Sequence, residues 1–273
     1  MASVGEKFSD QERWNRYGAD KLRQLQTDPA AHRIRGFPFY YCGACCQMLD
    51  LVSPIEGKRI LELGCGRGEF SVWLAQQGAA ITAIDLGPDL VAAAEALARA
   101  NGVDCDFRQG TVADLPLDDD CFDAVVGVGI LHHLSEADVR STLRECHRVL
   151  KHGGLAVFSE PVENSRLFDF VQNLVPVFGN DGSGSRPSVL QRKAWAKYVA
   201  ARDDRAMTAR ELTAAGKGLF RSVTTSPHGC FVRLARGPGS SRRSRLLALD
   251  RFLFRLCPPL GHFSQTALAQ YRK

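Results

Sequence analysis

From residue 58 onward, short apolar runs alternate with amphipathic segments over roughly the next hundred residues. Apolar runs of this length between turn residues are typical of buried strands, and apolar positions that recur every three or four residues indicate helices. The pattern predicts strands at 59–63, 80–85, 105–110, 122–129 and 155–160, and helices at 69–77, 88–101 and 135–150. Strands and helices that alternate in this way predict an α/β domain, a mostly parallel sheet with helices on both faces.

Turn and capping residues mark several helix ends. Pro88 and Gly102 frame the helix at 88–101. Ser135 is the expected N-cap of the helix at 135–150, and the glycines at 153–154 are expected to end that helix in a left-handed turn. Thr208 and Glu211 have the spacing of a capping box, which predicts a further short helix.

Three regions lie outside this alternating pattern. Residues 1–50 are predicted to be a helical flap, because Trp14, Tyr17, Leu22 and Leu25 recur at helical spacing. Residues 162–218 are interpreted as an insertion after the fifth strand, with a flexible point at 180–188. Segments 219–229 and 231–237 are expected to form a hairpin that closes the sheet. The main domain would then span 51–237, and residues 238–273 would form a tail with its own helix.

The composition is that of a globular protein, with 45% hydrophobic and 24% charged residues. No apolar run reaches the roughly 18 residues that a spanning helix needs, and the first residues lack the apolar core of a signal peptide. Most of the nine cysteines stand singly in apolar runs, which is typical of reduced thiols. The cysteine cluster at 42–46 has no second pair, so no metal site is expected. These features favour a cytoplasmic protein.

Basic residues are concentrated in the last third of the chain. Residues 184–273 contain 18 Lys and Arg against 4 Asp and Glu, whereas the preceding part is acidic. Within the stretch 240–260, three arginines precede a predicted helix with a wide apolar arc, interrupted by Asp250. Such a helix either docks on its own domain or lies at an anionic membrane surface. Contact with nucleic acid or an acidic carrier protein is a third alternative.

A glycine-rich loop follows the first predicted strand, with the sequence Glu62-Leu63-Gly64-Cys65-Gly66-Arg67-Gly68. Alternate glycines allow a sharp turn and a close ligand approach, and the helix that follows offers free N–H groups. Asp85 ends the second strand, where a carboxylate accepts hydrogen bonds from both ribose hydroxyls. The pattern therefore indicates a nucleotide-like cofactor. The order G-x-G-x-G differs from the dinucleotide fingerprint, and no phosphate-binding loop of the G-x-x-x-x-G-K-[ST] type is present.

Four segments together resemble the class I S-adenosylmethionine-dependent methyltransferases: ILELGCGRGEF (60–70), AIDLGP (83–88), 110–134 and 145–161. The likeness is strongest to the small-molecule branch, in which the sequence L-H-H-L follows the fourth strand. It implies a doubly wound, mostly parallel seven-stranded sheet (Rossmann-like) and S-adenosyl-L-methionine as the methyl donor.

The resemblance also implies which residues surround the donor. The glycine loop would wrap its methionine part, Asp85 would hold the ribose, and Thr111 would stand where many members carry Asp or Asn at the adenine edge. The implied donor residues are Glu62, Gly64, Cys65, Gly66, Gly68, Asp85, Leu86, Thr111, Val112, Asp114, Val128 and Gly129.

Candidate acceptor residues follow the fourth and fifth strands. His132 and His133 are candidate general bases, because histidine ordinarily changes charge near neutral pH. Glu160 is expected either to orient one of them, to bind the acceptor, or to make a structural hydrogen bond. Trp14, Tyr40 and Tyr41 either cover the donor or only pack the flap, and His228 is expected to be structural.

Methyl transfer from a sulfonium needs mainly alignment and the exclusion of water, and an oxygen acceptor also needs a base. Neither an [ND]-P-P-[YF] motif nor a cysteine nucleophile follows the fourth strand, which disfavours two modes of nucleic-acid base methylation. The sequence predicts methylation of a small-molecule or lipid-like acceptor, preferably at oxygen. An RNA or protein methyltransferase that grips its substrate with the basic tail, and a donor-binding adapter without activity, stay open.

Overall fold

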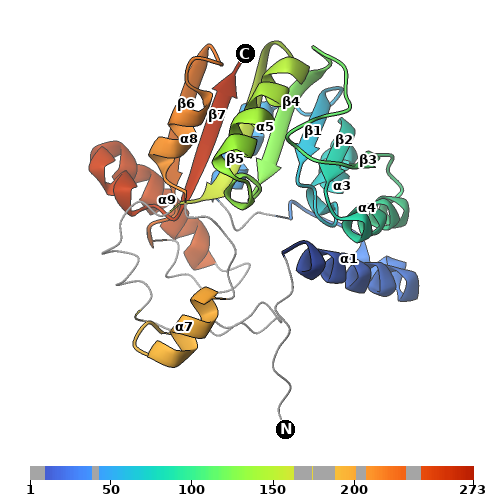
Figure 1. The fold of residues 1–273 in the computed structure, drawn as a ribbon, viewed down its shortest axis with the longest axis horizontal. Helices are drawn as coiled ribbons and strands as arrows, with labels where there is room; N and C mark the ends of the chain where they lie inside the picture. Colours follow the sequence, from blue (N-terminus) through green and yellow to red (C-terminus); the bar gives the residue numbers. More distant parts are fainter. Residues whose placement is uncertain (1–9, 39–42, 163–173, 175–187, 201–206, 232–240) are drawn as a thin grey trace.

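The computed structural model describes residues 10–38, 43–162, 174, 188–200, 207–231 and 241–273 (Figure 1). Within these residues, seven strands form one sheet in the order β3-β2-β1-β4-β5-β7-β6. The strands are β1 Arg59–Leu63, β2 Ala80–Asp85, β3 Asp106–Gln109, β4 Phe122–Val128, β5 Leu150–Pro161, β6 Ser222–His228 and β7 Thr266–Arg272. The first five pair in parallel, and β7 runs antiparallel to both of its neighbours. The expected doubly wound, mostly parallel, seven-stranded α/β fold is confirmed.

Helices cover both faces of the sheet. The α-helices are α1 Asp10–Thr27, α2 Gly43–Val52, α3 Glu69–Gln76, α4 Pro88–Asn101, α5 Glu136–Val149, α7 Arg192–Ala200, α8 Ala209–Gly216 and α9 Ser241–Leu256. Shorter 3-10 turns are η1 Pro29–His32, η2 Leu131–His133 and η4 Pro258–Phe263. Residues of α5 and α8 pack against one set of strand side chains, and residues of α2 and α3 pack against the other. Because strand side chains alternate between faces, both faces of the central strands are buried.

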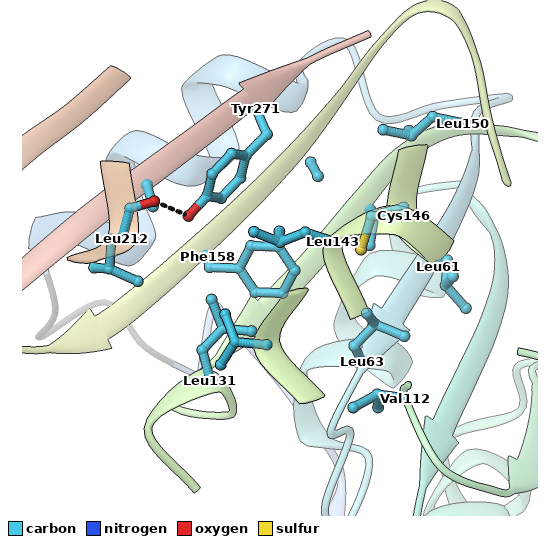
Figure 2. Close-up of a cluster of buried hydrophobic side chains, with 14 of the residues drawn as sticks. Leu61, Leu63, Val112, Leu131, Leu143, Cys146, Leu150, Phe158, Leu212 and Tyr271 are labelled. Atoms are coloured by element: carbon cyan, nitrogen blue, oxygen red, sulfur yellow. Dashed lines mark hydrogen bonds between the residues drawn. The ribbon is translucent and has the colours of Figure 1, made fainter. Parts of the chain in front are cut away.

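The core on the α5 side contains Phe158, with Leu131 and Leu143 beside its ring, and also includes Leu61 and Leu63 of β1 (Figure 2). Tyr271 of β7 reaches the same cluster and is fully buried. Its hydroxyl donates a hydrogen bond of 2.8 Å to the carbonyl oxygen of Leu212 in α8 (Figure 2). Burial also raises the pKa of the Tyr271 phenol, which therefore stays a donor. This bond ties β7 to the helix that covers it.

Local capping signals in the sequence are confirmed at three helices. Pro88 stands in the first turn of α4, and Gly102 ends the helix in a left-handed conformation with φ of 67°. The Ser135 side chain accepts the backbone N–H of Asp138 at the start of α5. At α8, the side chains of Thr208 and Glu211 each accept the other residue's backbone N–H, which is the predicted capping box.

The end of α5 differs from the prediction. The helix stops at Val149, and Leu150 is already extended and pairs with Phe122 of β4. The strand β5 therefore begins five residues before the predicted 155–160 and includes Gly153, which has φ of 77°. The predicted glycine cap at 153–154 is wrong, because these glycines lie where the register between β4 and β5 shifts.

The closing hairpin is half right. β6 lies inside the predicted segment 219–229, and among the described residues the strand paired with it is β7 at 266–272. Only Phe231 of the expected partner segment is among the described residues. The predicted tail helix is present as α9, yet the same tail supplies a strand that lies between β5 and β6. The expected domain end at residue 237 is therefore wrong, since residues 266–272 belong to the sheet.

The outer segments are described only in part. Helix α1 contains the predicted periodic residues from Trp14 to Leu25. The expected flexible point at 180–188 lies outside the described residues, apart from Ser188. Among the helices that the structure describes, none is both long enough and apolar enough to cross a bilayer.

Candidate functional site

A cavity of about 590 Å³ opens where β1, β2 and β4 end. Ligands of open α/β sheets bind at this edge, beyond the carboxyl ends of the parallel strands. The lining residues come from α1, the end of β1 and the glycine loop, the ends of β2 and β4, the first turns of α3 and α4, and the segments after β2, β3 and β4: Trp14, Tyr17, Glu62, Gly64, Cys65, Gly66, Arg67, Glu69, Phe70, Asp85, Leu86, Gly87, Leu90, Gly110, Thr111, Val112, Val128, Gly129, Ile130, His133 and Leu134. Most of the donor residues implied by the sequence are therefore brought together in one space.

All three glycines of the loop have positive φ. The space around each of them differs, so glycine is required for a different structural reason at each position. A Cβ atom at Gly66 would meet no atom within 4 Å, so this residue leaves open room beside the cavity. A Cβ atom at Gly64 would come within 2.8 Å of the Ile130 side chain, and one at Gly68 within 2.7 Å of Ala94 in α4. Gly68 does not line the cavity. It permits close packing of α3 against α4, whereas Gly66 permits the approach of a ligand.

Asp85 is held at the end of β2 by backbone donors. Its Oδ2 atom accepts the N–H of Gly66 at 2.8 Å, and its Oδ1 atom accepts the N–H of Gly87 at 2.9 Å. Burial raises the pKa of this carboxyl, and the backbone hydrogen bonds from Gly87 and Gly66 oppose that change. Each carboxylate oxygen has a second lone pair. The side chain is therefore fixed in place and still able to accept a pair of hydroxyl groups.

Glu62 is a buried carboxyl group beside the same cavity. The hydroxyl of Ser71 in α3 donates a short hydrogen bond to its Oε2 atom. Burial raises the pKa of Glu62 to about 8, so the neutral form predominates at pH 7. A positively charged group in the cavity would favour the ionised form. The site thus contains an acid whose charge depends on what lies next to it.

The segment after β3 contributes to the wall that the resemblance assigns to adenine. Leu86, Thr111 and Val112 line the cavity. The Thr111 hydroxyl accepts the backbone N–H of Ala113 at 3.2 Å, a local turn contact. Asp114 is exposed and outside the cavity lining. The structure therefore brings Thr111 to the site, and it does not bring Asp114 there.

The two histidines of η2 have different surroundings. His133 lines the cavity, whereas His132 is buried and lies outside the lining. The Nδ1 atom of His132 is 2.8 Å from Oε2 of Glu160. Glu160 is fully buried and also accepts the backbone N–H groups of Ile130, Leu131 and His132 at 3.0, 2.9 and 3.3 Å.

These contacts favour the structural alternative for Glu160 and leave His132 outside the cavity lining. Neither lines the cavity where an acceptor would bind. A buried carboxylate that accepts four hydrogen bonds is a fixed structural group, because the polar donors around it offset its removal from water. Glu160 instead fixes the turn that presents His133, and His132 fixes Glu160 in return. Only His133 keeps the geometry of a candidate base.

Helix α1 forms a wall of the cavity above the glycine loop. The Trp14 ring contacts the His133 ring edge to face, with 5.9 Å between centroids. The Tyr17 ring lies over the Arg67 guanidinium, 4.1 Å from it. Gly18 fits so closely on α4 that a Cβ atom there would be 2.5 Å from the Asp89 backbone. Tyr40 and Tyr41 lie outside the described residues.

Several lining residues were absent from the sequence-based site. They are Tyr17, Arg67, Glu69, Phe70, Gly87, Leu90, Gly110, Ile130 and Leu134. Tyr17 stands three residues after Trp14 on one helix face, so helical spacing alone was a usable signal. Ile130 and Leu134 flank the two histidines. The residues on α1 are far from the glycine loop in sequence, and only the folded chain shows that they share its cavity.

Sequence comparisons point to one class of protein. Residues 60–154 match the family model described as "Methyltransferase domain". A ubiquinone biosynthesis O-methyltransferase of Pseudomonas syringae pv. tomato is 33% identical over 158 residues, which cover 55% of this chain and 66% of that protein. A protein of the same name from Azotobacter vinelandii is 36% identical over 118 residues, covering 42% of this chain and 49% of that protein. The chain thus spans between about half and just under two thirds of these curated relatives.

Solved structures share the fold at low sequence identity. The PH0226 protein of Pyrococcus horikoshii has a TM-score of 0.57 and 14% identity, with 92% of this chain and 98% of that chain covered. Phosphoethanolamine N-methyltransferase 2 of Haemonchus contortus, solved with S-adenosyl-L-methionine, has a TM-score of 0.55 and 14% identity, covering 84% of this chain and 51% of that chain. The glycine loop, the strand order and the match over residues 60–154 are those of a class I S-adenosylmethionine-dependent methyltransferase domain, which this chain resembles.

Proposed function

We propose that this protein transfers a methyl group from S-adenosyl-L-methionine to a small-molecule or lipid-like acceptor, at oxygen. One observation carries the proposal: the glycine loop, Asp85 and His133 border the same cavity. An oxygen acceptor must lose a proton during transfer, and His133 is an imidazole at the place where that proton would leave. The names of the curated relatives support oxygen as the acceptor atom.

The residues present fit the donor. Open space at Gly66 allows its backbone close to a ligand, and Asp85 keeps lone pairs for ribose hydroxyls. Val128 and Gly129 border the cavity at the end of β4, next to His133. When bound, the donor supplies a methyl group on a positively charged sulfur, which needs no further activation. The protein therefore has to bind, align and desolvate the reactants.

The remaining steps are assigned to side chains of this chain. His133 accepts the proton of the acceptor hydroxyl, while Glu160 holds the turn in place. Trp14 and Tyr17 cover the cavity and exclude water, which would compete with the acceptor. Apolar lining residues such as Ile130 and Leu134 favour an acceptor with an aromatic or lipid-like body.

The test of the base uses the variant His133→Ala, with His152→Ala as control because His152 is exposed and outside the cavity lining. Turnover of soluble phenols and catechols with methyl-labelled donor should fall about 10²- to 10⁴-fold in His133→Ala and stay unchanged in the control. Titration with S-adenosylhomocysteine should show an unchanged donor site. Full turnover in both His133→Ala and the double variant with His132→Ala would exclude a histidine base.

The test of the donor site uses Asp85→Ala. Loss of hydrogen bonds to a charged acceptor should weaken S-adenosylhomocysteine binding by roughly 2–4 kcal/mol. Isothermal titration calorimetry gives the affinity, and thermal unfolding shows whether the loop still folds. Asp85→Asn keeps part of the hydrogen bonding. Its affinity for S-adenosylhomocysteine should therefore fall between those of Asp85→Ala and the wild type. An affinity equal to that of the wild type would falsify the assignment of Asp85.

The other interpretations differ in measurable ways. An RNA or protein methyltransferase would bind a charged polymer with steep salt dependence, since released counterions drive such binding. A donor-binding adapter would bind S-adenosylhomocysteine without turnover of any acceptor. We also propose a cytoplasmic location and peripheral contact of residues 240–260 with an anionic membrane. The membrane contact would use a different surface from the cavity.

A further inference from the structure

The rotation of α9 about its axis is set by Asp250. This residue is 2% exposed, and its carboxylate accepts the backbone N–H groups of Cys230 at 3.1 Å and of Phe231 at 2.7 Å. In the sequence, Asp250 interrupts the apolar arc of the helix. In the structure it anchors the helix to the segment that follows β6, so the opposite side of α9 faces outward.

The outward side of α9 carries a row of large apolar side chains. Leu249, Phe252 and Leu256 are 41%, 58% and 67% exposed. They are three and four residues apart, which places them along one side of the helix. The half-buried side chains, among them Leu246, Leu247 and Leu253, lie on the Asp250 side. A single exposed leucine is ordinary, but three aligned large side chains form a surface that favours removal from water.

Cations border this row. Arg245, Arg251 and Arg255 are exposed, and among the described residues none of the three takes part in an ion pair. At 100° per residue, Arg245 falls between Phe252 and Leu256, and the other two arginines lie along the far edge of the outward side. Asp250 is the acidic residue of α9, and it points inward. An apolar row with cations around it complements an anionic lipid surface, where acyl chains and phosphates lie side by side.

The position of α9 relative to the cavity supports the same partner. Both β5 and β6 are antiparallel to β7, so they run parallel to each other. Cys230 and Phe231 therefore follow the carboxyl end of β6, at the same edge of the sheet as the cavity. Figure 1 shows α9 and α1 along this edge, on either side of the strand ends. A surface held by α9 would lie on the side of the molecule where the cavity opens.

We propose that the outward side of α9 binds an anionic lipid surface, with Leu249, Phe252 and Leu256 entering the interface and the three arginines pairing with phosphate groups. The inference does not depend on the identity of the methyl acceptor. The proposed lipid surface would cover side chains of α9 that are exposed in the described part of the structure.

The experiment is sedimentation of the full-length protein with vesicles. Vesicles of phosphatidylcholine mixed with phosphatidylglycerol should bind the protein at low salt, and pure phosphatidylcholine should not. Each arginine near an anionic membrane contributes about fivefold to binding, so Arg251→Glu with Arg255→Glu should weaken it by roughly 25-fold or more. The matched control is Arg140→Glu with Arg144→Glu, an exposed pair at the same spacing on α5.

The apolar part is tested by Phe252→Ser with Leu256→Ser, and the control is Leu190→Ser, which is 71% exposed. The double variant should lose vesicle binding, and the control should keep it. Titration with S-adenosylhomocysteine checks that every variant is folded and reports on the donor site separately.

Three results would overturn the inference. The first is a wild-type protein that ignores anionic vesicles at low salt. The second is that Arg251→Glu with Arg255→Glu weakens vesicle binding no more than the control pair on α5 does. The third is a dimer in sedimentation equilibrium that Phe252→Ser with Leu256→Ser dissociates, which would assign the surface to a second copy of the chain.

Discussion

Glu62 shows how burial changes the chemistry of one residue. Folding raises its pKa from the ordinary 4.5 to about 8, because the carboxyl leaves water. The folded state therefore holds a proton that the unfolded state gives up above pH 4.5. The stability associated with the protonated form is fully present below pH 4.5 and is lost as pH rises through about 8.

The variant Glu62→Gln should not lose this stability as pH rises, because its side chain does not titrate. Its free energy of unfolding, relative to the wild type, should rise between pH 5 and pH 8 by an amount on the order of a few kcal/mol. Urea unfolding at several pH values measures the difference. Glu136→Gln, at an exposed position on α5, should show no such trend. A difference between Glu62→Gln and wild type that does not change with pH would show that Glu62 is already ionised in the folded protein.

At the residue scale, sequence motifs predicted the donor side of the site better than the acceptor side. Gly66 lies in the loop after β1 and Asp85 ends β2, so their places follow from the strand pattern. The choice between His132 and His133 does not follow from it, because Glu160, nearly thirty residues later, decides which ring is buried. Asp114 lies outside the cavity lining, and the residues around it in the sequence do not indicate which way its turn points.

At the scale of elements, helix α1 packs closely on α4. A Cβ atom at Gly18 would lie 2.5 Å from the carbonyl carbon of Asp89 and from the backbone nitrogen of Leu90. Backbone atoms cannot give way as a flexible side chain does. Because residue 18 has no side chain, α1 packs closely on α4. This packing holds Trp14 and Tyr17 over the site.

The variant Gly18→Ala gives a test in which two effects have opposite signs. Helix propensity alone would stabilise the protein by about 1 kcal/mol. Overpacking against α4 should destabilise it by about 1–3 kcal/mol and weaken S-adenosylhomocysteine binding as α1 shifts. Thermal unfolding and calorimetric titration measure both quantities. Gly36→Ala, where a Cβ atom meets nothing within 4 Å, should leave both unchanged. A more stable Gly18→Ala protein would show that α1 tolerates the added methyl group.

Elements were predictable where their signals were local. Helix α4 matched its prediction because Pro88 and Gly102 mark its ends directly. The strand β7 was missed because its short sequence, TALAQYR, follows a helix and a proline pair, and its partners lie far away in the chain. Strand formation depends on cross-strand neighbours more than on the strand's own residues. Sequence adjacency therefore favoured 231–237 as the partner of β6, whereas the described partner is β7.

For the molecule as a whole, the last described strand, β7, joins the edge strand β6 to the five parallel strands. β7 pairs with β5 along 155–161 and with β6 along 222–228. Its buried Tyr271 adds the hydrogen bond to Leu212 (Figure 2). The tail that the sequence placed outside the domain thus belongs to its core.

The variant Tyr271→Phe should therefore destabilise the whole domain. It leaves the Leu212 carbonyl oxygen without this donor in a buried place, which costs roughly 1–3 kcal/mol. Chemical denaturation monitored by far-ultraviolet circular dichroism measures the loss as one cooperative transition. Tyr17→Phe, at a partly exposed position, serves as the control and should be close to wild type in stability. Equal stability of the two variants would mean that the hydroxyl of Tyr271 adds nothing to the packing of its ring.

The position of β7 has a consequence for synthesis on the ribosome. β5 ends at Pro161 and β7 begins at Thr266, so roughly a hundred residues are translated while one edge of β5 has no partner. An uncovered strand edge of apolar residues is a template for pairing with other nascent chains. Premature termination anywhere in that interval would release a product with this edge exposed. Heterologous expression should accordingly gain from abundant chaperones, and the insertion between the two strands lengthens the interval in which that protection is needed.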